Sequence, residues 1–230
     1  MGQKDLYSVI IPAYNEETRI RSVLSTFIQA FSGHEIIVVC DGADRTADIV
    51  DEVSKENPMI RLLRYQERLG KGGAIIEGFR ASHGQRIGFA DADESAEPAE
   101  IKGMFDALDG ADGLIGSRRL KGSKITIKQP LMRRAISRIF NIVFAHILFG
   151  LPFNDTQCGA KVFTREAVMD IIDDLEGRGF ETDLEILWRL EKKGYTVREY
   201  PITWKHSEGS TFRLSYSWKM FVSLMKIRWG

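Results

Sequence analysis

Asp91 and Asp93 stand one residue apart, directly after a short apolar segment at residues 86–90. Carboxylate oxygens are hard ligands, and such ligands select Mg²⁺ or Mn²⁺. An ion held by one or two carboxylates commonly completes its coordination with phosphate oxygens of a substrate. The pair therefore predicts a divalent-metal site for a phosphate-bearing ligand. The alternative is a pair of solvated carboxylates in a turn.

A glycine-rich segment at residues 69–73 contains Lys71 and precedes a predicted helix. Backbone N–H groups at the beginning of a helix bind phosphate, and a lysine adds positive charge. The segment has neither the GxxxxGKS/T spacing of a P-loop nor a GxGxxG spacing. The first predicted strand is followed by PAYNEE rather than by glycines, which argues against a Rossmann dehydrogenase.

The elements that must position these groups follow an alternating pattern. Short apolar segments rich in β-branched residues predict strands at residues 7–12, 35–40, 60–65, 86–90 and 113–116. Helical spacing of apolar residues predicts helices at residues 16–31, 46–57, 73–82 and 98–108. This alternation is typical of an α/β fold with a mostly parallel sheet flanked by helices. The loops after the first four strands should therefore meet at one edge, where ligands bind.

The net charge of zero, from 32 basic and 32 acidic residues, hides an uneven distribution. Residues 113–154 contain eight basic residues and no acidic one. They are Arg118, Arg119, Lys121, Lys124, Lys128, Arg133, Arg134 and Arg138. Such a region predicts an anionic partner: a phosphorylated ligand, phospholipid headgroups or nucleic acid. A solvated face without a partner is the alternative.

Two segments in the C-terminal half are apolar and flanked by basic residues. Residues 139–153 form an apolar run of 15 residues, shorter than the about 20 needed to span a bilayer. The run predicts either a helix in the plane of a membrane interface or a buried core helix. Residues 213–230 combine aromatic residues with lysine and arginine and predict an amphipathic C-terminal helix.

Two features bear on the cellular compartment. The two cysteines, Cys40 and Cys158, form no CxxC pair and no disulfide framework, which favours a reducing compartment. Asp5 interrupts the apolar residues near the N-terminus, so we expect no signal peptide there. The predicted location is cytoplasmic, peripheral at the cytoplasmic face of a membrane, with attachment by the chain itself or by an anchoring partner.

Five motifs in order identify a resemblance: VIIPAYNEE, VVCDGADRT, LGKGGA, FADADE and DTQCGAKVF. The chain resembles family 2 glycosyltransferases with the GT-A fold, and in particular the branch of dolichyl-phosphate mannose synthases and dolichyl-phosphate glucosyltransferases. Gly-Ser-Arg at residues 116–118 and WKHSEGS at residues 204–210 support that branch. The resemblance covers about residues 7–211.

The resemblance implies contacts with the nucleotide sugar for Pro12, Tyr14, Glu16, Asp41 and Lys71. Asp91 and Asp93 match the motif that binds sugar and metal, with Asp93 favoured as the direct metal ligand. Arg118, Arg133 and Ser137 match the positions that hold the acceptor's phosphate. Ser95 stands where mannose synthases usually have a glutamine.

The function so implied is metal-dependent, inverting transfer of glucose or mannose from UDP-glucose or GDP-mannose to a polyprenyl phosphate at a membrane surface. Mg²⁺ or Mn²⁺ is the expected cofactor. A phosphate acceptor is already an anion near neutrality and needs no general base. The residues expected to carry the reaction are Asp93, Arg118 and Asp155.

Two alternatives remain at this point. If the acceptor is a hydroxyl of a sugar or lipid, a base is required, and Asp155 is the first candidate, with Glu181 and Asp183 behind it. A nucleic-acid-binding module would use the basic residues, but the stretch has no aromatic residue before Phe140 to stack on bases. We therefore expect no nucleic acid partner.

The expected organisation is one GT-A catalytic domain at residues 1–212, followed by the amphipathic helix at residues 213–230. Within the domain, residues 1–117 would bind the nucleotide sugar and residues 118–212 the acceptor.

Overall fold

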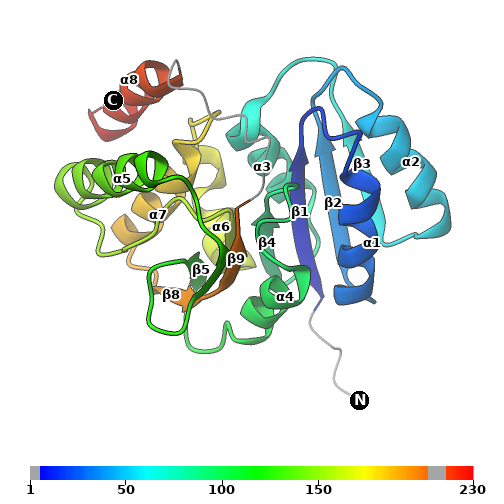
Figure 1. The fold of residues 1–230 in the computed structure, drawn as a ribbon, viewed down its shortest axis with the longest axis horizontal. Helices are drawn as coiled ribbons and strands as arrows, with labels where there is room; N and C mark the ends of the chain where they lie inside the picture. The colour runs from blue at the N-terminus through cyan, green and yellow to red at the C-terminus, as the bar shows by residue number, and fades with distance from the viewer. Residues whose placement is uncertain (1–5, 207–215, 230) are drawn as a thin grey trace.

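The computed structural model describes residues 6–206 and 216–229, leaving aside the side chains of Arg133 and of residues 216–219. A seven-stranded sheet has the order β3-β2-β1-β4-β7-β5-β8 (Figure 1). Its strands are β1 (Tyr7–Ala13), β2 (Glu35–Cys40), β3 (Ile60–Arg64), β4 (Arg86–Ala90), β5 (Gly113–Ser117), β7 (Ala160–Thr164) and β8 (Val197–Pro201). A two-stranded ribbon pairs β6 (Lys124–Ile127) with β9 (Thr203–Lys205).

Helices cover both faces of the sheet (Figure 1). They are α1 (Ile20–Ala30), α2 (Thr46–Glu56), α3 (Gly70–Ala81), α4 (Pro98–Asp106), α5 (Leu131–Phe140), α6 (Arg165–Ile171), α7 (Thr182–Lys192) and α8 (Tyr216–Trp229). A π-helix, η1 (Asn141–Leu148), continues α5, and a short 3₁₀-helix, η2 (Ile172–Asp174), continues α6.

The predicted mostly parallel sheet is confirmed. β1 pairs in parallel with β2 and β4, β2 pairs in parallel with β3, and β5 pairs in parallel with β8. Only β7 among these strands runs antiparallel to its neighbours, β4 and β5. The ends of β1 to β5 that lead into the expected ligand-binding loops therefore lie at the same edge.

β1 lies in the interior of the sheet between β2 and β4, and its alternating side chains are buried on both faces because helices cover both. Ile10 packs with α3 and α7 residues on one face, whereas Val9 and Ile11 pack with α1 and α4 residues on the other. α3 approaches the sheet closely at Gly78, where a Cβ would lie 2.4 Å from Ile10 Cγ2. A larger residue at this position would push the helix away from β1.

Some predicted boundaries were wrong at the start of helices. The helix expected from residue 16 begins at Ile20, because Asn15 has a φ of 55° and residues 16–19 form a turn. The helix expected from residue 73 begins at Gly70, whose φ of 76° suits glycine. Lys71 therefore lies in the first turn of α3 rather than in a preceding loop.

The apolar run of residues 139–153 combines features of both alternatives considered for it. Ala145 and Phe149 are buried in the core, and Asn141 is buried as well. On its other side the run presents apolar side chains to solvent, with Ile139 60% and Ile147 75% exposed. Within the described ranges, no helix has both the length and the apolar character needed to cross a membrane.

We call the exposed apolar residues of α5, η1 and α8 the apolar face. Its members are Leu131, Met132, Ile136, Ile139, Ile142, Val143, Ile147, Phe221, Val222 and Trp229. α8 packs beside η1, with the Phe144 and Phe221 ring centroids 6.1 Å apart and Arg228 Nε donating to Leu148 O (Figure 1). Trp218 and Lys219, which the C-terminal prediction also used, have side chains outside the described part.

Candidate active site

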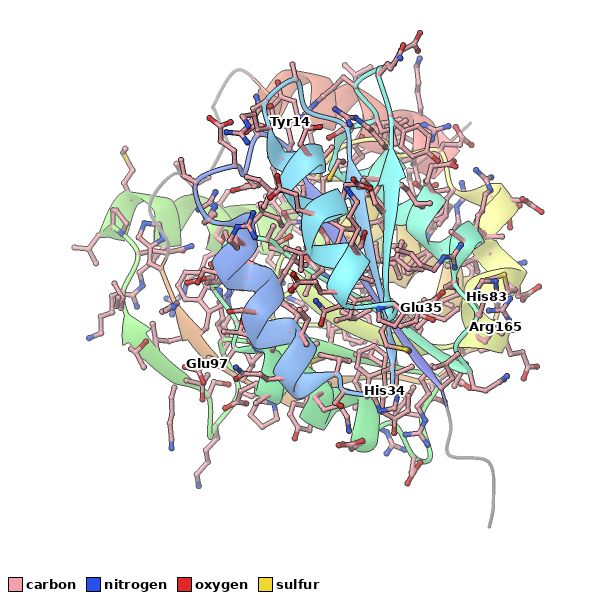
Figure 2. All side chains as sticks on the ribbon, turned by 90° about the vertical axis from the view of Figure 1, so that its right-hand side faces the viewer. Tyr14, His34, Glu35, His83, Glu97 and Arg165 are labelled. Carbon is pink, nitrogen blue, oxygen red and sulfur yellow. The ribbon has the colours of Figure 1, made fainter. Side chains whose placement is uncertain are left out.

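The loops after β1 and β2 pack directly against each other. Asn15 Oδ1 accepts a hydrogen bond from Ala43 N at 3.1 Å, and Glu16 N donates to Thr46 Oγ1 at 2.8 Å. Gly42 permits this approach, since a Cβ there would lie 2.5 Å from Asn15 Oδ1. The predicted nucleotide-contacting loops therefore form one wall at the edge of the sheet. Figure 2 shows Tyr14 at this end and His34, Glu35 and His83 toward the other.

Asp41 joins the second loop to the start of α3. Its Oδ2 accepts hydrogen bonds from the backbone N–H groups of Leu69, at 2.9 Å, and Gly70, at 2.8 Å. Arg68 lies 3.6 Å from Asp41 Oδ1 and stacks on Tyr14, with its guanidinium carbon 3.1 Å from the ring centroid. The loops after β1, β2 and β3 thus meet at Tyr14, Asp41 and Arg68. Sequence reasoning missed Arg68.

Asp91 and Lys71 belong to a row of alternating charges. Lys71 Nζ lies 2.9 Å from Asp91 Oδ1 and 3.1 Å from Asp183 Oδ2. Lys161 Nζ lies 2.5 Å from Asp183 Oδ1. Burial alone would raise the pKa of Asp183, but the charges of Lys161 and Lys71 hold it below the usual value. Asp183, a reserve candidate for the general base, is thus committed to two lysines.

Burial also affects the pKa values of Lys71 and Asp91, the two members of this row that are nearest the surface. It would lower the pKa of Lys71, yet the charges of Asp183 and Asp91 outweigh it and raise that pKa. Burial raises the pKa of Asp91, and the charges of Asp93 and Asp183 add to the effect in spite of the Lys71 ion pair. Lys71 is therefore a fixed cation at the mouth of the site.

Asp93 lies nearer the wall formed by the first loop. Its Oδ1 accepts a hydrogen bond from Ser95 N at 2.9 Å. Glu16 forms an ion pair with Arg19, and burial raises the pKa of Glu16, with the charge of Asp93 contributing in the same direction. The two predicted metal-binding carboxylates thus have different surroundings: Asp91 faces Lys71, and Asp93 faces Glu16 and Arg19.

The surroundings of Asp91 and Asp93 fit a divalent ion that also binds a diphosphate. Gly159 forms a cradle for the Asp91 carboxylate, since a Cβ there would lie 1.8 Å from Asp91 Oδ2. Among the described residues, no group of three His, Cys, Asp or Glu side chains is arranged to hold a metal on its own. Two carboxylates would leave coordination positions for phosphate oxygens and water, as Mg²⁺ and Mn²⁺ prefer.

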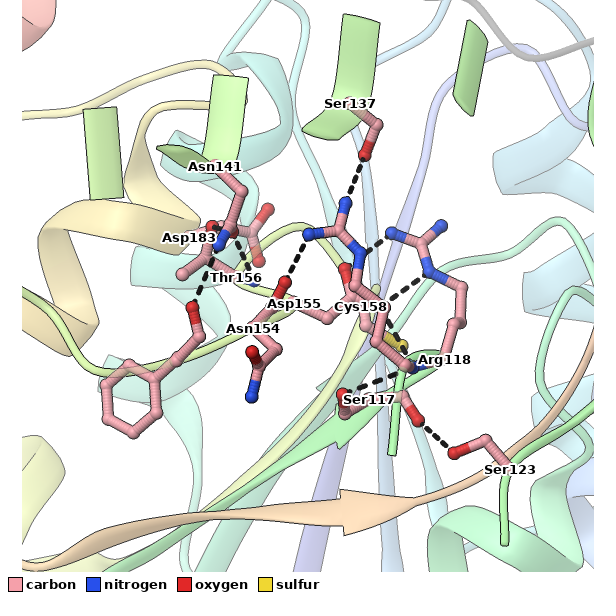
Figure 3. A network of polar contacts seen from close by, with 12 residues as sticks. Ser117, Arg118, Ser123, Ser137, Asn141, Asn154, Asp155, Thr156, Cys158 and Asp183 are labelled. Carbon is pink, nitrogen blue, oxygen red and sulfur yellow. Dashed lines mark hydrogen bonds and ion pairs between the residues drawn. The ribbon is translucent and has the colours of Figure 1, made fainter. Parts of the chain in front are cut away.

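Arg118 and Asp155, predicted as separate catalytic groups, form one ion pair (Figure 3). Arg118 Nε and Nη2 each lie 2.7 Å from a carboxylate oxygen, and Arg118 N donates to Oδ2 at 2.9 Å. Burial would raise the pKa of Asp155, but Arg118 holds it below the usual value. This arrangement disfavours Asp155 as a base, because its oxygens already accept three hydrogen bonds from Arg118, two from the guanidinium and one from the backbone N–H.

Glu181, the other reserve base, is occupied as well. Its Oε1 accepts hydrogen bonds from Arg178 N at 3.1 Å and Gly179 N at 2.9 Å. Cys158 is buried, and burial raises the pKa of its thiol to about 11, so it stays protonated near neutrality. Neither residue has the surroundings of a base or nucleophile.

A basic pocket of about 350 Å³ opens beside the Arg118–Asp155 pair. It is lined by Arg118, Arg119, Ile125, Lys128, Gln129, Arg134, Ser137, Arg138 and Trp204. No acidic residue is among them, and Arg119 Nη2 donates to Ser137 Oγ at 3.2 Å. Burial lowers the pKa of Arg119, and the like charges of Arg118 and Arg138 lower it further. An anion would relieve this crowding of cations.

Of the predicted acceptor residues, Arg118 and Ser137 line this pocket, and the side chain of Arg133 lies outside the described part. Arg119, Lys128, Arg134 and Arg138 were counted in the basic region but were not assigned to a site. They come from the loop after β5, the loop before α5, and α5 itself. They come together because α5 contacts the loop after β5, as the Arg119–Ser137 hydrogen bond shows, and composition does not reveal this contact.

The ribbon of β6 and β9 connects the pocket to the Asp93 loop. Lys205 N donates to Ser95 O at 2.9 Å, and Ala96 forms an isolated bridge with Trp204. Trp204 also lies beneath Arg118, 5.2 Å from ring centroid to guanidinium carbon. Residues 207–210 of the WKHSEGS motif lie outside the described residues. The carboxylate edge and the basic pocket are therefore adjacent parts of one site.

Comparison with known families decides what kind of site this is. The model of glycosyl transferase family 2 matches residues 8–172. The chain belongs to this family. It is a glycosyltransferase, and the resemblance stated from its motifs is confirmed.

Two of its curated relatives have names that refer to sugar-carrying lipid phosphates. Over 96% of this chain and 73% of the relative, it is 32% identical to the dolichyl-phosphate beta-glucosyltransferase of Saccharomyces cerevisiae. Over 91% of this chain and 81% of the relative, it is 30% identical to the polyprenol monophosphomannose synthase of Mycolicibacterium smegmatis.

Solved structures confirm the GT-A fold. Glucosyl-3-phosphoglycerate synthase from Mycobacterium tuberculosis, with Mn²⁺, UDP-glucose and phosphoglyceric acid, superposes with a TM-score of 0.71 at 16% identity. That comparison covers 97% of this chain and 78% of the other. A mannosyltransferase from Pyrobaculum calidifontis, with GDP-mannose and Mn²⁺, gives 0.64 at 17% identity, covering 98% and 65%.

Proposed function

We propose that this glycosyltransferase moves a hexose from a nucleoside diphosphate sugar to a polyprenyl phosphate, with inversion at the anomeric carbon. The observation that carries the proposal is the basic pocket beside the Asp91 and Asp93 edge. The proposed reaction has two anionic substrates, and each needs its own binding region. The acidic edge would bind the donor's diphosphate through a metal ion, and the basic pocket would bind the acceptor's phosphate directly. The names of the glucosyltransferase and mannose synthase relatives support the same substrates.

The donor would lie against the loops after β1, β2 and β4. Pro12, Tyr14, Glu16 and Asp41 are the proposed contacts for the nucleotide, and Lys71 offers a cation to the diphosphate. Asp91 and Asp93 would hold Mg²⁺ or Mn²⁺. Such an ion, when bound, neutralises charge on the diphosphate leaving group.

The acceptor's phosphate would occupy the basic pocket. Arg119 and Arg138, with Ser137 between them, are the proposed direct contacts, since Arg118 is engaged by Asp155. A phosphate monoester has a second pKa of about 6, and surrounding cations favour its dianion. The phosphate oxygen can therefore attack without a general base, and rate acceleration comes from positioning and charge.

A hydroxyl acceptor is disfavoured by the same geometry. It needs a base, and Asp155, Glu181 and Asp183 are each held by cations or backbone N–H groups. Binding of nucleic acid is disfavoured too. A nucleic acid is a long polyanion, and it would be repelled by Asp91 and Asp93, which lie next to the pocket.

The apolar face suggests how the chain meets a lipid substrate. It lies on α5, η1 and α8, and α5 also contributes three residues to the basic pocket. Elsewhere in the described part only Tyr14, Met59 and Ile127 are large apolar side chains of similar exposure. We propose peripheral attachment to the cytoplasmic face of a membrane through this face, with a polyprenyl tail entering lipid beside it.

The proposed donor, acceptor and membrane-binding regions correspond to successive ranges of the chain. Residues 1–117 would form the nucleotide-sugar half and residues 118–212 the acceptor half of one catalytic domain, with residues 213–230 as a membrane-facing helix.

The deciding experiment combines donor binding with product analysis. Thermal unfolding is measured with GDP or UDP, each with and without Mn²⁺; stabilisation by one nucleotide should require the ion and follow its concentration. The chain is then incubated with the matching nucleotide sugar and a polyprenyl phosphate in detergent, and the lipid is analysed by mass spectrometry. Absence of a hexosyl phospholipid, despite metal-dependent nucleotide binding, would reject this acceptor.

A further inference from the structure

A row of four charged side chains runs from the protein core to the metal-binding edge. Lys161 comes from β7, Asp183 from α7, Lys71 from α3, and Asp91 follows β4. The exposed fraction of their side chains rises along the row, from 0% for Lys161 and 2% for Asp183 to 14% for Lys71 and 35% for Asp91. The row therefore connects a completely buried cation with a carboxylate that a metal ion can reach.

Lys161 is an unusual residue for its position. It is the second residue of β7, a strand flanked on both sides by other strands, where apolar residues are expected. Besides Asp183, its ammonium group donates to Cys158 O at 2.7 Å and lies 5.3 Å from the Phe89 ring centroid. Among these contacts Asp183 is the charged one, and it connects Lys161 to Lys71.

Lys71 divides its interaction between two carboxylates. Its Nζ is 2.9 Å from Asp91 Oδ1 and 3.1 Å from Asp183 Oδ2, so neither partner holds it alone. Lys71 competes with a metal ion for the charge of Asp91, because both are cations next to one carboxylate. Whatever strengthens the hold of Asp183 on Lys71 therefore leaves Asp91 more available to the ion.

We infer that Asp183 and Lys161 are positioning residues that set how firmly Asp91 holds a divalent cation, by fixing how Lys71 is shared. Asp183 draws Lys71 away from Asp91, and Lys161 limits that pull by neutralising part of the Asp183 charge. This inference rests on the proposed function, since it takes Asp91 as part of a metal-binding edge. It adds two buried residues to the site, neither of which touches substrate or metal.

The inference predicts effects of opposite sign in two variants. In Asp183→Asn, Lys71 has Asp91 as its remaining anionic partner, and Mn²⁺ binding should weaken about three- to tenfold. In Lys161→Met, Asp183 acts on Lys71 with its full charge, and Mn²⁺ binding should tighten by a similar factor. The double variant removes both charges and should bind Mn²⁺ nearly as the unaltered chain does.

The measurement is the affinity for Mn²⁺ in the presence of saturating GDP or UDP, whichever nucleotide stabilises the unaltered chain. Free Mn²⁺ is followed by electron paramagnetic resonance, so no transfer activity is required. Glu35→Gln is the matched control: Glu35 is a buried carboxylate paired with Arg61 and His83 at the other end of the sheet (Figure 2). It should lose stability without changing Mn²⁺ affinity.

The outcomes separate this inference from the proposed function. Shifts of the same sign in the two single variants, or Mn²⁺ affinity unchanged in a folded Asp183→Asn chain, would overturn the inference alone. If circular dichroism shows that Lys161→Met does not fold, Asp183→Asn still tests the inference. Lys161→Arg keeps the positive charge and should bind Mn²⁺ with the affinity of the unaltered chain. Failure of the unaltered chain to bind Mn²⁺ with either nucleotide would overturn the proposed function, and this inference with it.

Discussion

Arg118 and Asp155, 37 residues apart in the sequence, meet in a two-pronged ion pair with both N···O distances at 2.7 Å. The Asp155 side chain is 1% exposed and that of Arg118 16%. Arg118 follows β5, whereas Asp155 belongs to the DTQCG segment that leads into β7. The pair therefore connects the loop that begins the basic pocket to the segment that cradles Asp91.

Asp155→Asn should destabilise the fold. The change leaves the mostly buried Arg118 without its anion, and breaking a buried ion pair from one side costs about 3–5 kcal/mol. Urea unfolding followed by circular dichroism measures the difference. Asp109→Asn is a suitable control, because Asp109 is paired with Arg86 but its side chain is 82% exposed, and it should change stability by less than about 1 kcal/mol.

The Asp155 contribution to stability should also depend on pH. Arg118 holds the folded-state pKa of Asp155 below 3.8, the ordinary value that applies in the unfolded chain. A depressed pKa gives stability that reaches its full value above the unfolded-state pKa and is lost as pH falls through the folded-state value. The stability difference between the unaltered chain and Asp155→Asn should thus be constant above about pH 5 and shrink in stronger acid. A difference that grew on acidification would contradict this assignment.

Arg119→Gln and Arg138→Gln should impair use of the lipid acceptor. Each removes a cation from the proposed phosphate pocket, and a charge-assisted hydrogen bond contributes about 1.5–3 kcal/mol. The KM for polyprenyl phosphate should rise by roughly tenfold or more, while the KM for the nucleotide sugar stays unchanged. Lys121→Gln, an exposed change in the same basic segment that does not line the pocket, should leave both values as they were.

Asp93→Ala should abolish transfer and remove the Mn²⁺-dependent stabilisation by nucleotide, with the fold intact. The reason is that one of two candidate carboxylate ligands is lost from a site with no third such residue among those described. Thermal unfolding with nucleotide and Mn²⁺ provides the measurement. Glu97→Ala, an exposed carboxylate a few residues later, should retain the stabilisation; turnover by Asp93→Ala at the unaltered rate would rule out the metal role.

Ile139→Ser together with Ile147→Ser should weaken binding to vesicles. Both side chains are more than half exposed on the apolar face, and burying a large aliphatic side chain contributes about 1.5–3 kcal/mol. Sedimentation with vesicles containing anionic phospholipid should show at least a tenfold loss of affinity. Met59→Ser, on the loop between α2 and β3, is the control; equal loss in that variant would show that the apolar face is not the attachment surface.

Much of the donor half was predictable because its signals are local. Residues 35–40 and 86–90 form strands with the predicted boundaries, since unbroken apolar segments between turn residues leave little choice. Once the sheet is parallel, Asp41 after β2 and Asp91 after β4 must lie at the same edge, on either side of β1. The recognised motifs placed the family and its chemistry.

The acceptor half was less predictable because its contacts join distant segments. Nothing near Asp155 in the sequence indicates that its side chain pairs with Arg118. The catalytic roles expected of these two residues stay predictions. β7 enters the sheet antiparallel, which alternation of strands and helices does not suggest. One local signal was overlooked: Lys161 is a single charge inside the apolar segment GAKVF, and a buried lysine requires an anion such as Asp183.

The hydrogen bond from Lys205 N to Ser95 O and the bridge between Ala96 and Trp204 connect the proposed donor site to the proposed acceptor site. A shift of the turn after Asp93 on binding of the sugar donor would act on β9 and on the indole beside Arg118 through these two contacts. We therefore expect an ordered kinetic mechanism in which the nucleotide sugar binds first. The lipid phosphate should bind with higher affinity after the nucleotide sugar has bound.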